Sequence, residues 1–192
     1  AIVCYAMLVA PRVFYGELRH RKYIGTLAER CGRLPAAINP ERQASIWIHA
    51  VSVGEVLATR ALIPALRGRY PGHRLWMSTT TETGRAVAAR FKAVDGLFYF
   101  PLDLPLIVNR VLDQVRPDLF LMVDTELWPN LLRHCARRGV KTVLVNGRIS
   151  DRSYPRYRLV RGFLRRVLAG VDRCCVQSEE TARRLIELGA LP

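Results

Sequence analysis

The feature that most constrains the fold is a regular alternation of apolar, strand-like runs with helix-like stretches that begins at Ser45. The strand-like runs are Ser45–Ala50, Arg74–Thr79, Leu97–Phe100, Leu119–Val123, Thr142–Val145 and Arg173–Val176. The helix-like stretches are Glu55–Arg69, Thr83–Lys92, Leu106–Val115, Pro129–Arg138, Arg156–Leu168 and Glu179–Leu188. Strands that alternate with helices imply β-α-β crossovers, so the sequence predicts an α/β fold with a Rossmann-like parallel sheet and helices on both faces.

The length of 192 residues suits one such domain with an extra segment at its amino-terminal end. We predict a membrane-proximal apolar segment and basic linker or lid over residues 1–44, and the Rossmann-like domain over residues 45–192. The apolar run Ala1–Ala10 is shorter than the roughly 20 residues that a transmembrane helix needs. We interpret it as the remnant of a longer anchor, and the basic residues after it favour the cytoplasmic side for the main body. Whether the segment spans a membrane stays open.

The run from His49 to Glu55 places a carboxylate in the first turn of a helix directly after a strand. In open α/β sheets, ligands bind outside the carboxyl ends of the strands. Glu55 can therefore be a general base, with Gly54 permitting close backbone approach and free N–H groups near Ser52 holding an anion. The alternative is an acid placed there only because the positive end of the helix dipole favours it.

Two further strand ends carry polar groups. Ser78–Gly84 contains a run of hydroxyl residues, including Thr80 and Thr81, which can cap the next helix or present hydroxyls to a sugar or phosphate. In Thr125–Asn130, Glu126 precedes Trp128 before a predicted helix, and a carboxylate beside an aromatic ring suits sugar recognition. The alternative is a capped helix with the tryptophan packed on the sheet.

The net charge of +14 arises from 30 lysine and arginine residues against 16 acids, and nearly all the basic residues are arginine. Seven arginines lie close together with a single acid among them: Arg148, Arg152, Arg156, Arg158, Arg161, Arg165 and Arg166. Like charges without compensation repel one another, so the pattern favours an anionic partner over a plain solvated face. Arginine suits phosphate because its planar fork can bind two oxygens. No nucleic-acid-binding motif accompanies these residues, so we expect no nucleic-acid partner.

Metal and cofactor signatures are absent from the sequence. The five cysteines contain no C-x-x-C pair, which predicts reduced, mostly buried thiols and no zinc site. The four histidines have no metal-ligand spacing, and His49 is either a structural residue or part of the Glu55 site. The usual nucleotide-binding glycine motifs do not occur. We therefore expect neither a metal nor a cofactor.

Taken together, His49–Glu55, Ser78–Gly84, Pro101-Leu102-Asp103, Thr125–Asn130 and Asn146–Ser150 resemble the amino-terminal half of the 3-deoxy-D-manno-octulosonic acid (Kdo) transferases. The resemblance implies the amino-terminal, acceptor-binding domain of a glycosyltransferase-B fold. It implies an inner-membrane enzyme of lipopolysaccharide synthesis, on the cytoplasmic face, that transfers Kdo from CMP-Kdo to a lipid A precursor with inversion and without a metal.

The resemblance also assigns roles to residues. Glu55 matches the catalytic base, and Glu126 matches a second acid that orients acceptor or donor. The acceptor-binding set that we predict is Ser52, Gly54, Thr80, Thr81, Gly84, Glu126 and Arg148. The arginines then face the phosphates of lipid A and of neighbouring anionic lipids.

The chain stops at Pro192, where the donor domain of the family would begin, so we expect a fragment without activity of its own. Two other functions stay open. One is a non-catalytic, arginine-rich module that docks on an anionic membrane or RNA, and the other is a glycosyltransferase-B enzyme with a different activated sugar. Sequence leaves undecided the number of Kdo units, the acylation preference and the oligomeric state.

Overall fold

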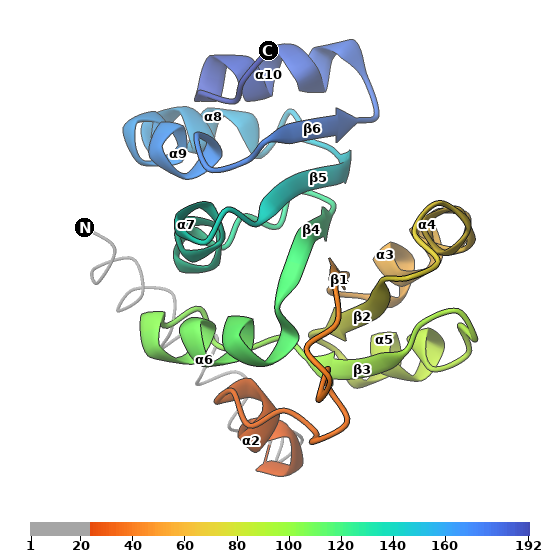
Figure 1. The fold of residues 1–192 in the computed structure, drawn as a ribbon. Helices are drawn as coiled ribbons and strands as arrows, with labels where there is room; N and C mark the ends of the chain where they lie inside the picture. The colour runs from red at the N-terminus through yellow and green to blue at the C-terminus, as the bar shows by residue number, and fades with distance from the viewer. Residues whose placement is uncertain (1–23) are drawn as a thin grey trace.

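The computed structural model describes residues 24–192, which form one six-stranded, all-parallel sheet (Figure 1). The strands are β1 (Ser45–His49), β2 (Arg74–Thr79), β3 (Gly96–Tyr99), β4 (Pro117–Val123), β5 (Lys141–Gly147) and β6 (Arg173–Val176). Their order in the sheet is β3-β2-β1-β4-β5-β6, with Ile48 beside Met77 on one side and Leu121 on the other. The predicted Rossmann-like parallel sheet is confirmed, and the order reverses between β1 and β4.

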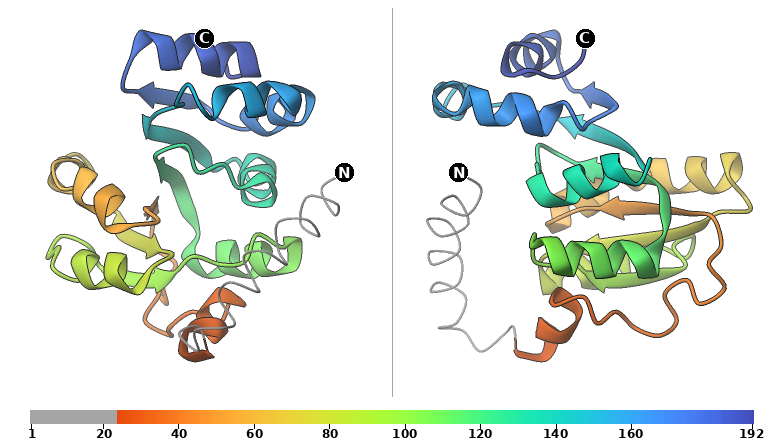
Figure 2. Two further views of the ribbon diagram at one scale, coloured as in Figure 1. Left: turned by 180° about the vertical axis from the view of Figure 1, so that it is seen from behind. Right: turned by 60° about the vertical axis from the view of Figure 1, so that its left-hand side comes forward.

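Helices cover both faces of this sheet (Figures 1 and 2). They are η1 (Ile24–Thr26), α2 (Leu27–Arg30), α3 (Val53–Ala58), α4 (Leu62–Arg69), α5 (Glu82–Ala88), α6 (Pro105–Val115), α7 (Pro129–Arg137), α8 (Tyr154–Leu159), α9 (Arg161–Leu168) and α10 (Glu179–Leu188). The sheet separates two hydrophobic cores. One is built around Trp47, Phe98 and Phe120 and receives α6, α7, α9 and α10, and the other, around Ile48 and Met77, receives α3, α4 and α5.

Two stretches predicted as single helices are each broken in two. Glu55–Arg69 divides into α3 and α4 because Pro64 lacks an N–H and its ring would clash with the carbonyl of Arg60 in a continuous helix. Since α4 begins at Leu62, Pro64 falls in its first turn, where a proline is tolerated. Arg156–Leu168 divides at Val160 into α8 and α9, and both pieces pack aromatic side chains on the same core.

The segment before β1 is attached to the sheet by buried polar contacts. One carboxylate oxygen of Glu29 accepts hydrogen bonds from the Tyr99 N–H at 2.8 Å and from Arg85 at 2.9 Å. Arg30 is 8% exposed and donates to the Thr80 carbonyl at 2.6 Å. Ile38 joins the core beside Trp47. The domain boundary at residue 44 stays a prediction.

Within residues 24–192, no helix has the length and apolar character that crossing a bilayer requires. The apolar run Ala1–Ala10 and the basic residues that follow it lie outside the described residues.

Candidate active site

The candidate site lies where the strand order reverses. We call the segments at the carboxyl ends of the strands, residues 50–55, 80–81, 101–103, 124–128 and 146–148, the strand-end loops. In a parallel sheet all the carboxyl ends meet at one edge, and a crevice opens where neighbouring strands send their connections to opposite faces. Here β1 continues into α3 on one face, and β4 continues into α7 on the other. The two predicted acids follow these two strands.

Glu55 is half-buried and its carboxylate is held from two directions. The Val51 N–H donates to Oε2 at 2.8 Å, and the Ser52 hydroxyl donates to Oε1 at 2.8 Å. Ser52 is the N-cap of α3, but its hydroxyl binds Glu55 rather than a helix N–H. This is the geometry of a helix-start acid, and it also fixes where the carboxylate points. Its use as a base stays a prediction.

Glu126 has the largest pKa shift of the carboxyl groups in residues 24–192. Burial, the charge of Glu55 and the charge of Asp124 raise its pKa from 4.5 to about 7. The contribution of Glu55 means that the structure brings the two predicted acids within electrostatic reach of each other. A carboxyl that titrates near neutral pH can exchange a proton during a reaction, so the pair has the character of a reactive site.

The hydroxyl run after β2 joins neighbouring loops. The Thr81 hydroxyl donates to the Val51 carbonyl at 3.2 Å and accepts from the Gly84 N–H at 3.1 Å, which caps α5. A Cβ on Gly84 would lie 2.9 Å from the Thr81 hydroxyl and 3.4 Å from the Val51 carbonyl oxygen, so only glycine allows this approach. The helix-capping alternative is therefore confirmed for Thr81. The Thr80 hydroxyl is buried without a hydrogen-bond partner among residues 24–192.

Gly54 differs from Gly84 in its surroundings. It is exposed, and a Cβ placed there meets no atom of residues 24–192 within 4 Å. Open space above the first turn of α3 is compatible with a ligand that crosses it, which is the role predicted from the sequence, but no contact of the described chain requires glycine at this position.

Arg148 is tied to the loop after β4. Its Nε donates to the Asp124 carboxylate at 2.8 Å, and its backbone N–H donates to the Thr125 hydroxyl at 3.1 Å. Asp124 and Asn146 both adopt left-handed backbone angles, with φ of 62° and 59°, where β4 and β5 end. Such angles are uncommon for residues other than glycine and fix the paths of both loops. The side chain of Arg148 stays 68% exposed and can contact an anion from this position.

Sequence analysis included Asp103 only in a motif of the family resemblance. In the structure its carboxylate caps the amino-terminal end of α7. Its two carboxylate oxygens accept the N–H groups of Asn130 at 3.0 Å and Leu131 at 2.8 Å, the second and third residues of α7. Burial raises the pKa of Asp103 despite these hydrogen bonds, which oppose the shift. The contact holds α7, and with it the Glu126 loop, against the loop after β3. The only sequence signal for this cap is Pro129, which marks the start of the helix.

His49 is buried at the carboxyl end of β1. It is fully buried and stacks on Phe100 with ring centroids 3.8 Å apart, and Trp128 contacts it edge-on at 6.1 Å. Its Nδ1 lies 3.0 Å from the Ser78 hydroxyl. Burial lowers its pKa to about 3, so the imidazole is neutral at physiological pH. Its Nε2 and the Trp128 Nε1 are buried without partners in the described part of the chain.

Metal and thiol chemistry find no support in the described residues. No group of three or more His, Cys, Asp or Glu side chains within residues 24–192 is placed to bind a metal ion. Cys135 is buried, and burial raises its pKa to about 12. Cys31 and Cys174 are half-buried, whereas Cys175 is exposed because β6 is an edge strand, contrary to the expectation of mostly buried thiols. Cys4 lies outside the described residues.

The arginines after Arg148 form a surface that we call the α8–α9 basic face. Its members are Arg152, Arg156, Arg158, Arg161, Arg165 and Arg166. All six are exposed, and none forms an ion pair with a residue in the range 24–192. The nearby acids Asp151 and Glu180 bind Arg184 instead. The basic face is therefore uncompensated within the described chain, as the sequence pattern predicts.

Comparison with protein families identifies residues 25–192 with the family described as 3-deoxy-D-manno-octulosonic-acid transferase (Kdo transferase). The chain belongs to this family. It is 34% identical over 98% of its length to a 3-deoxy-D-manno-octulosonic acid transferase of Haemophilus influenzae, and 36% identical over 84% to one of Bordetella pertussis. A bifunctional glycosyltransferase/methyltransferase of Fusobacterium nucleatum is 36% identical over 76% of the chain.

The chain spans less than half the length of these relatives: 44% of the Haemophilus protein, 39% of the Bordetella protein and 23% of the Fusobacterium protein. The predicted resemblance to the amino-terminal half of Kdo transferases is thereby confirmed. The acids Glu55 and Glu126 and the loops that hold them all lie inside the matched region.

Proposed function

We propose that this chain is the acceptor-binding domain of a glycosyltransferase-B enzyme that transfers Kdo from CMP-Kdo to a lipid A precursor in lipopolysaccharide biosynthesis. The observation that carries the proposal is the pair of interacting acids, Glu55 and Glu126, which follow the neighbouring strands β1 and β4. The raised pKa of Glu126, to about 7, depends in part on the charge of Glu55. Membership of the Kdo transferase family supports the choice of sugar.

In the proposed reaction Glu55 is the general base. Its carboxylate takes the proton of a primary hydroxyl on the acceptor as that oxygen forms a bond to the anomeric carbon of Kdo. The bond from this carbon to the CMP phosphate breaks on the opposite side, the phosphate leaves with the electron pair, and the configuration inverts. The hydrogen bonds from the Val51 N–H and the Ser52 hydroxyl hold the carboxylate in one orientation for this step.

Glu126 orients the acceptor or the donor beside the base. A carboxyl that titrates near neutral pH can either donate a hydrogen bond to a sugar hydroxyl or accept one. Ser52, Gly54, Thr80, Thr81, Gly84 and Arg148 complete the proposed acceptor site. Of these, Arg148 is the group suited to an acceptor phosphate, because its guanidinium is exposed.

The rest of the proposal concerns partners outside the chain. We place the binding of most of the CMP-Kdo donor in a domain beyond residues 1–192 and expect the isolated chain to be inactive. The α8–α9 basic face supports attachment to an anionic membrane, and we propose that the protein works on the cytoplasmic face of the inner membrane. No nucleic acid, metal or cofactor enters the proposal.

The test is Glu55→Gln in a protein that joins residues 1–192 to a donor-binding domain. We expect turnover to fall by about 10²–10⁴-fold, the range for loss of a general base, while the fold is kept. Glu82→Gln is the matched control, because Glu82 is an exposed acid in the first turn of the neighbouring helix α5. A Glu55→Gln protein that transfers Kdo at the control rate contradicts the proposed base. Trials with other activated sugars in the same assay decide the donor.

The uncompensated arginines favour a second candidate function, a non-catalytic module that docks on an anionic membrane or RNA. The same variants distinguish the two functions. A docking module keeps its binding when Glu55 is replaced by glutamine and shows no transfer in any context, whereas the transferase loses turnover and keeps binding.

A further inference from the structure

A groove of about 570 Å³ lies on the face of the sheet that α3, α4 and α5 cover. Its volume is within the range of about 300–1,000 Å³ that is typical of small-molecule sites. The lining residues come from all three helices, from the turn between α3 and α4 and from the turn after α5: Leu57, Arg60, Ile63, Pro64, Val87, Arg90, Phe91, Lys92 and Ala93. Most are apolar, and the three that are not are all cations. None of the site residues described above lines this groove.

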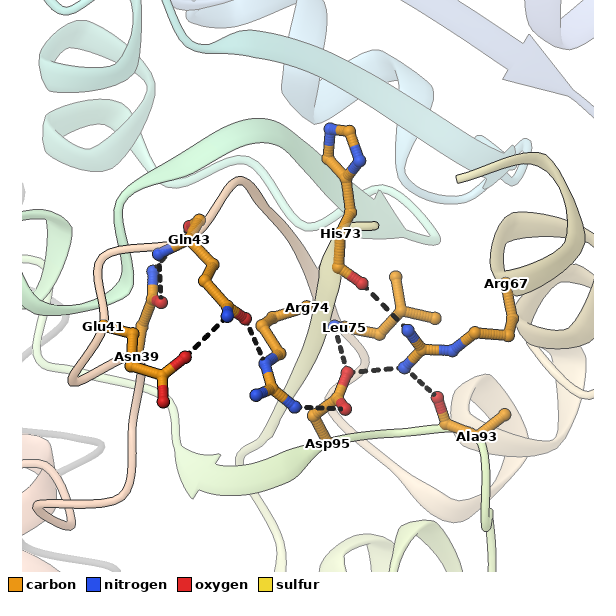
Figure 3. A network of polar contacts seen from close by, with 9 residues as sticks. All are labelled: Asn39, Glu41, Gln43, Arg67, His73, Arg74, Leu75, Ala93 and Asp95. Atoms are coloured by element: carbon orange, nitrogen blue, oxygen red, sulfur yellow. Dashed lines mark hydrogen bonds and ion pairs between the residues drawn. The ribbon is translucent and has the colours of Figure 1, made fainter. Parts of the chain in front are cut away.

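A polar network fastens α4 to the turn after α5, and both of these segments contribute residues to the groove (Figure 3). Arg67 of α4 donates to the Ala93 carbonyl at 2.8 Å and to the His73 carbonyl at 2.9 Å, and it forms an ion pair with Asp95 at 2.5 Å. Burial acts to raise the pKa of Asp95, but hydrogen bonds from the Leu75 N–H and from Arg67, together with the Arg67 charge, lower it overall. The α4 helix and the turn after α5 are therefore fixed to each other beside the groove.

The cations at the rim have no partners of their own. Arg60, Arg90 and Lys92 are exposed, and their side chains form no ion pair or hydrogen bond with any residue in the range 24–192. A positive rim beside an apolar floor complements a molecule with the opposite arrangement of groups, namely a hydrocarbon chain attached to an anion. A phosphate fits the rim because arginine and lysine both bind phosphate oxygens.

An exposed strip of small and apolar residues connects the groove with the Glu55 end of α3. Gly54, Leu57 and Ala58 are exposed, and Leu57 and Ala58 lie three and four positions after Gly54, so both neighbour it on one side of the helix. Ala61 and Pro64 continue the strip at the start of α4. Leu57 is 49% exposed although it is apolar. At Gly54, where this strip reaches the candidate active site, an added Cβ would meet no atom of residues 24–192 within 4 Å.

We propose that the groove binds an acyl chain of the lipid acceptor, with an acceptor phosphate on Arg60, Arg90 and Lys92. The acceptor's sugar end then lies at Glu55, and the chain crosses α3 over Gly54 to reach Leu57. This inference rests on the proposed function for the identity of the acceptor, but the binding of an acylated phosphate in the groove can be measured separately.

The first experiment uses the chain of residues 1–192 and a monomeric fluorescent lysophosphatidic acid as the probe. We expect Leu57→Gln to weaken probe binding by roughly fivefold, because a half-exposed leucine contributes about 1 kcal/mol of apolar contact. Arg90→Glu with Lys92→Glu should weaken it by about tenfold or more. Ile186→Gln and Arg183→Glu on α10 are matched controls, because Ile186 is 46% exposed and Arg183 is an exposed arginine. Both controls should bind the probe like the wild type.

Two results would contradict the binding of an acylated phosphate in the groove. One is unchanged affinity in both groove variants, with circular dichroism confirming that they are folded. The other is glycerol 3-phosphate, which has no chain, binding as tightly as the acylated probe.

A competition experiment tests whether the occupant is the acceptor. A phosphorylated, acylated lipid A precursor in non-ionic detergent should displace the probe, and the same sugar phosphate without acyl chains should not. If the probe binds in the groove and the acylated precursor fails to displace it, the acceptor assignment is wrong, even where Glu55→Gln abolishes transfer. If displacement occurs and Glu55→Gln leaves transfer intact, acceptor binding in the groove is supported and the proposed role of Glu55 as general base is wrong.

Discussion

The strand-end loops and the α8–α9 basic face both concentrate charge, but they hold it in opposite ways. In the strand-end loops, Glu55, Asp103 and Arg148 each have defined hydrogen-bond partners. The pKa of Glu126 is raised by burial and by the acids beside it. On the basic face, six exposed arginines have no partner within the described residues. Charge fixed by geometry suits a chemical step, whereas free charge suits attraction to an anionic surface. The two regions should therefore respond differently to mutation.

The largest loss of stability is expected from Asp103→Ala in the strand-end loops. The change leaves the N–H groups of Asn130 and Leu131 without their acceptor, and hydrogen bonds to a charged group contribute about 1.5–3 kcal/mol each. We expect the free energy of unfolding, measured by urea denaturation, to fall by about 3 kcal/mol or more. Asp113→Ala is the control, because Asp113 is 63% exposed in its ion pair with Arg138 and should cost less than about 1 kcal/mol. Equal losses in the two variants contradict the capping role.

Gly84→Ala should cause the next largest loss, of about 1–2 kcal/mol. The added Cβ comes within 2.9 Å of the Thr81 hydroxyl, so the cap of α5 has to shift or break. Gly54→Ala provides a comparison of opposite sign. The new methyl group there meets no described residue within 4 Å, and alanine has the higher helix propensity, so stability should be unchanged or rise. Thermal unfolding of both variants measures the difference in stability. A loss of stability in Gly54→Ala equal to that in Gly84→Ala would falsify this account of the two glycines.

Glu126→Gln should change how stability depends on pH. The pKa of Glu126 is raised to about 7 in the folded protein, from 4.5, so between these values the folded state holds a proton that the unfolded state has released. Stability from this group is present below about pH 4.5 and is lost as the pH rises through 7. After allowance for solvent screening, the variant should match the wild type at pH 4.5 and exceed its unfolding free energy by about 1–2 kcal/mol at pH 8.

The contribution of Glu55 to the raised pKa of Glu126 can be tested separately. Because the negative charge of Glu55 helps to raise the pKa of Glu126, Glu55→Gln should lower that pKa below 7. Carbon-detected NMR titration of the Glu126 carboxyl measures it directly. Glu82→Gln, which removes an exposed acid from α5, serves as the control. An unchanged Glu126 pKa in Glu55→Gln would mean that the two acids do not interact and would remove the main support for a joint site.

The fold could be predicted from the sequence because its strands are buried on both faces. The central strand β4 then appears as a continuous apolar run, Leu119–Val123, and the bounds of β2, Arg74–Thr79, were predicted as the structure has them. The broken helix at Pro64 follows from a local rule and could also have been predicted. Edge strand β6 retained its predicted bounds, although its exposed Cys175 did not fit the expectation of buried thiols.

The site could be predicted only in part. Glu55 and Glu126 were found because each follows a strand, and polar residues after parallel strands lie at one edge. Their mutual influence depends on β1 and β4 being neighbours, which the order of strands along the chain does not reveal. The Asp103 cap of α7 and the groove beside Leu57 both join segments that are far apart in sequence. Such contacts leave no periodic pattern, so no spacing rule could have found them.

The smallest effect on stability is expected on the α8–α9 basic face. Arg156→Gln, Arg158→Gln and Arg161→Gln together should change the free energy of unfolding by less than about 0.5 kcal/mol, because these side chains are exposed and bind no described residue. Affinity for vesicles that contain anionic phospholipid should nevertheless fall by about 10²-fold, since each arginine near such a surface contributes about 1 kcal/mol.

Arg184→Gln should have the opposite pattern of effects, on stability rather than on vesicle binding. Its side chain is 14% exposed and binds Asp151 and Glu180, so its loss should lower stability and leave vesicle binding unchanged. Cosedimentation over a salt series measures the binding, and a triple variant that unfolds early yet binds vesicles normally would remove the contrast between the two regions.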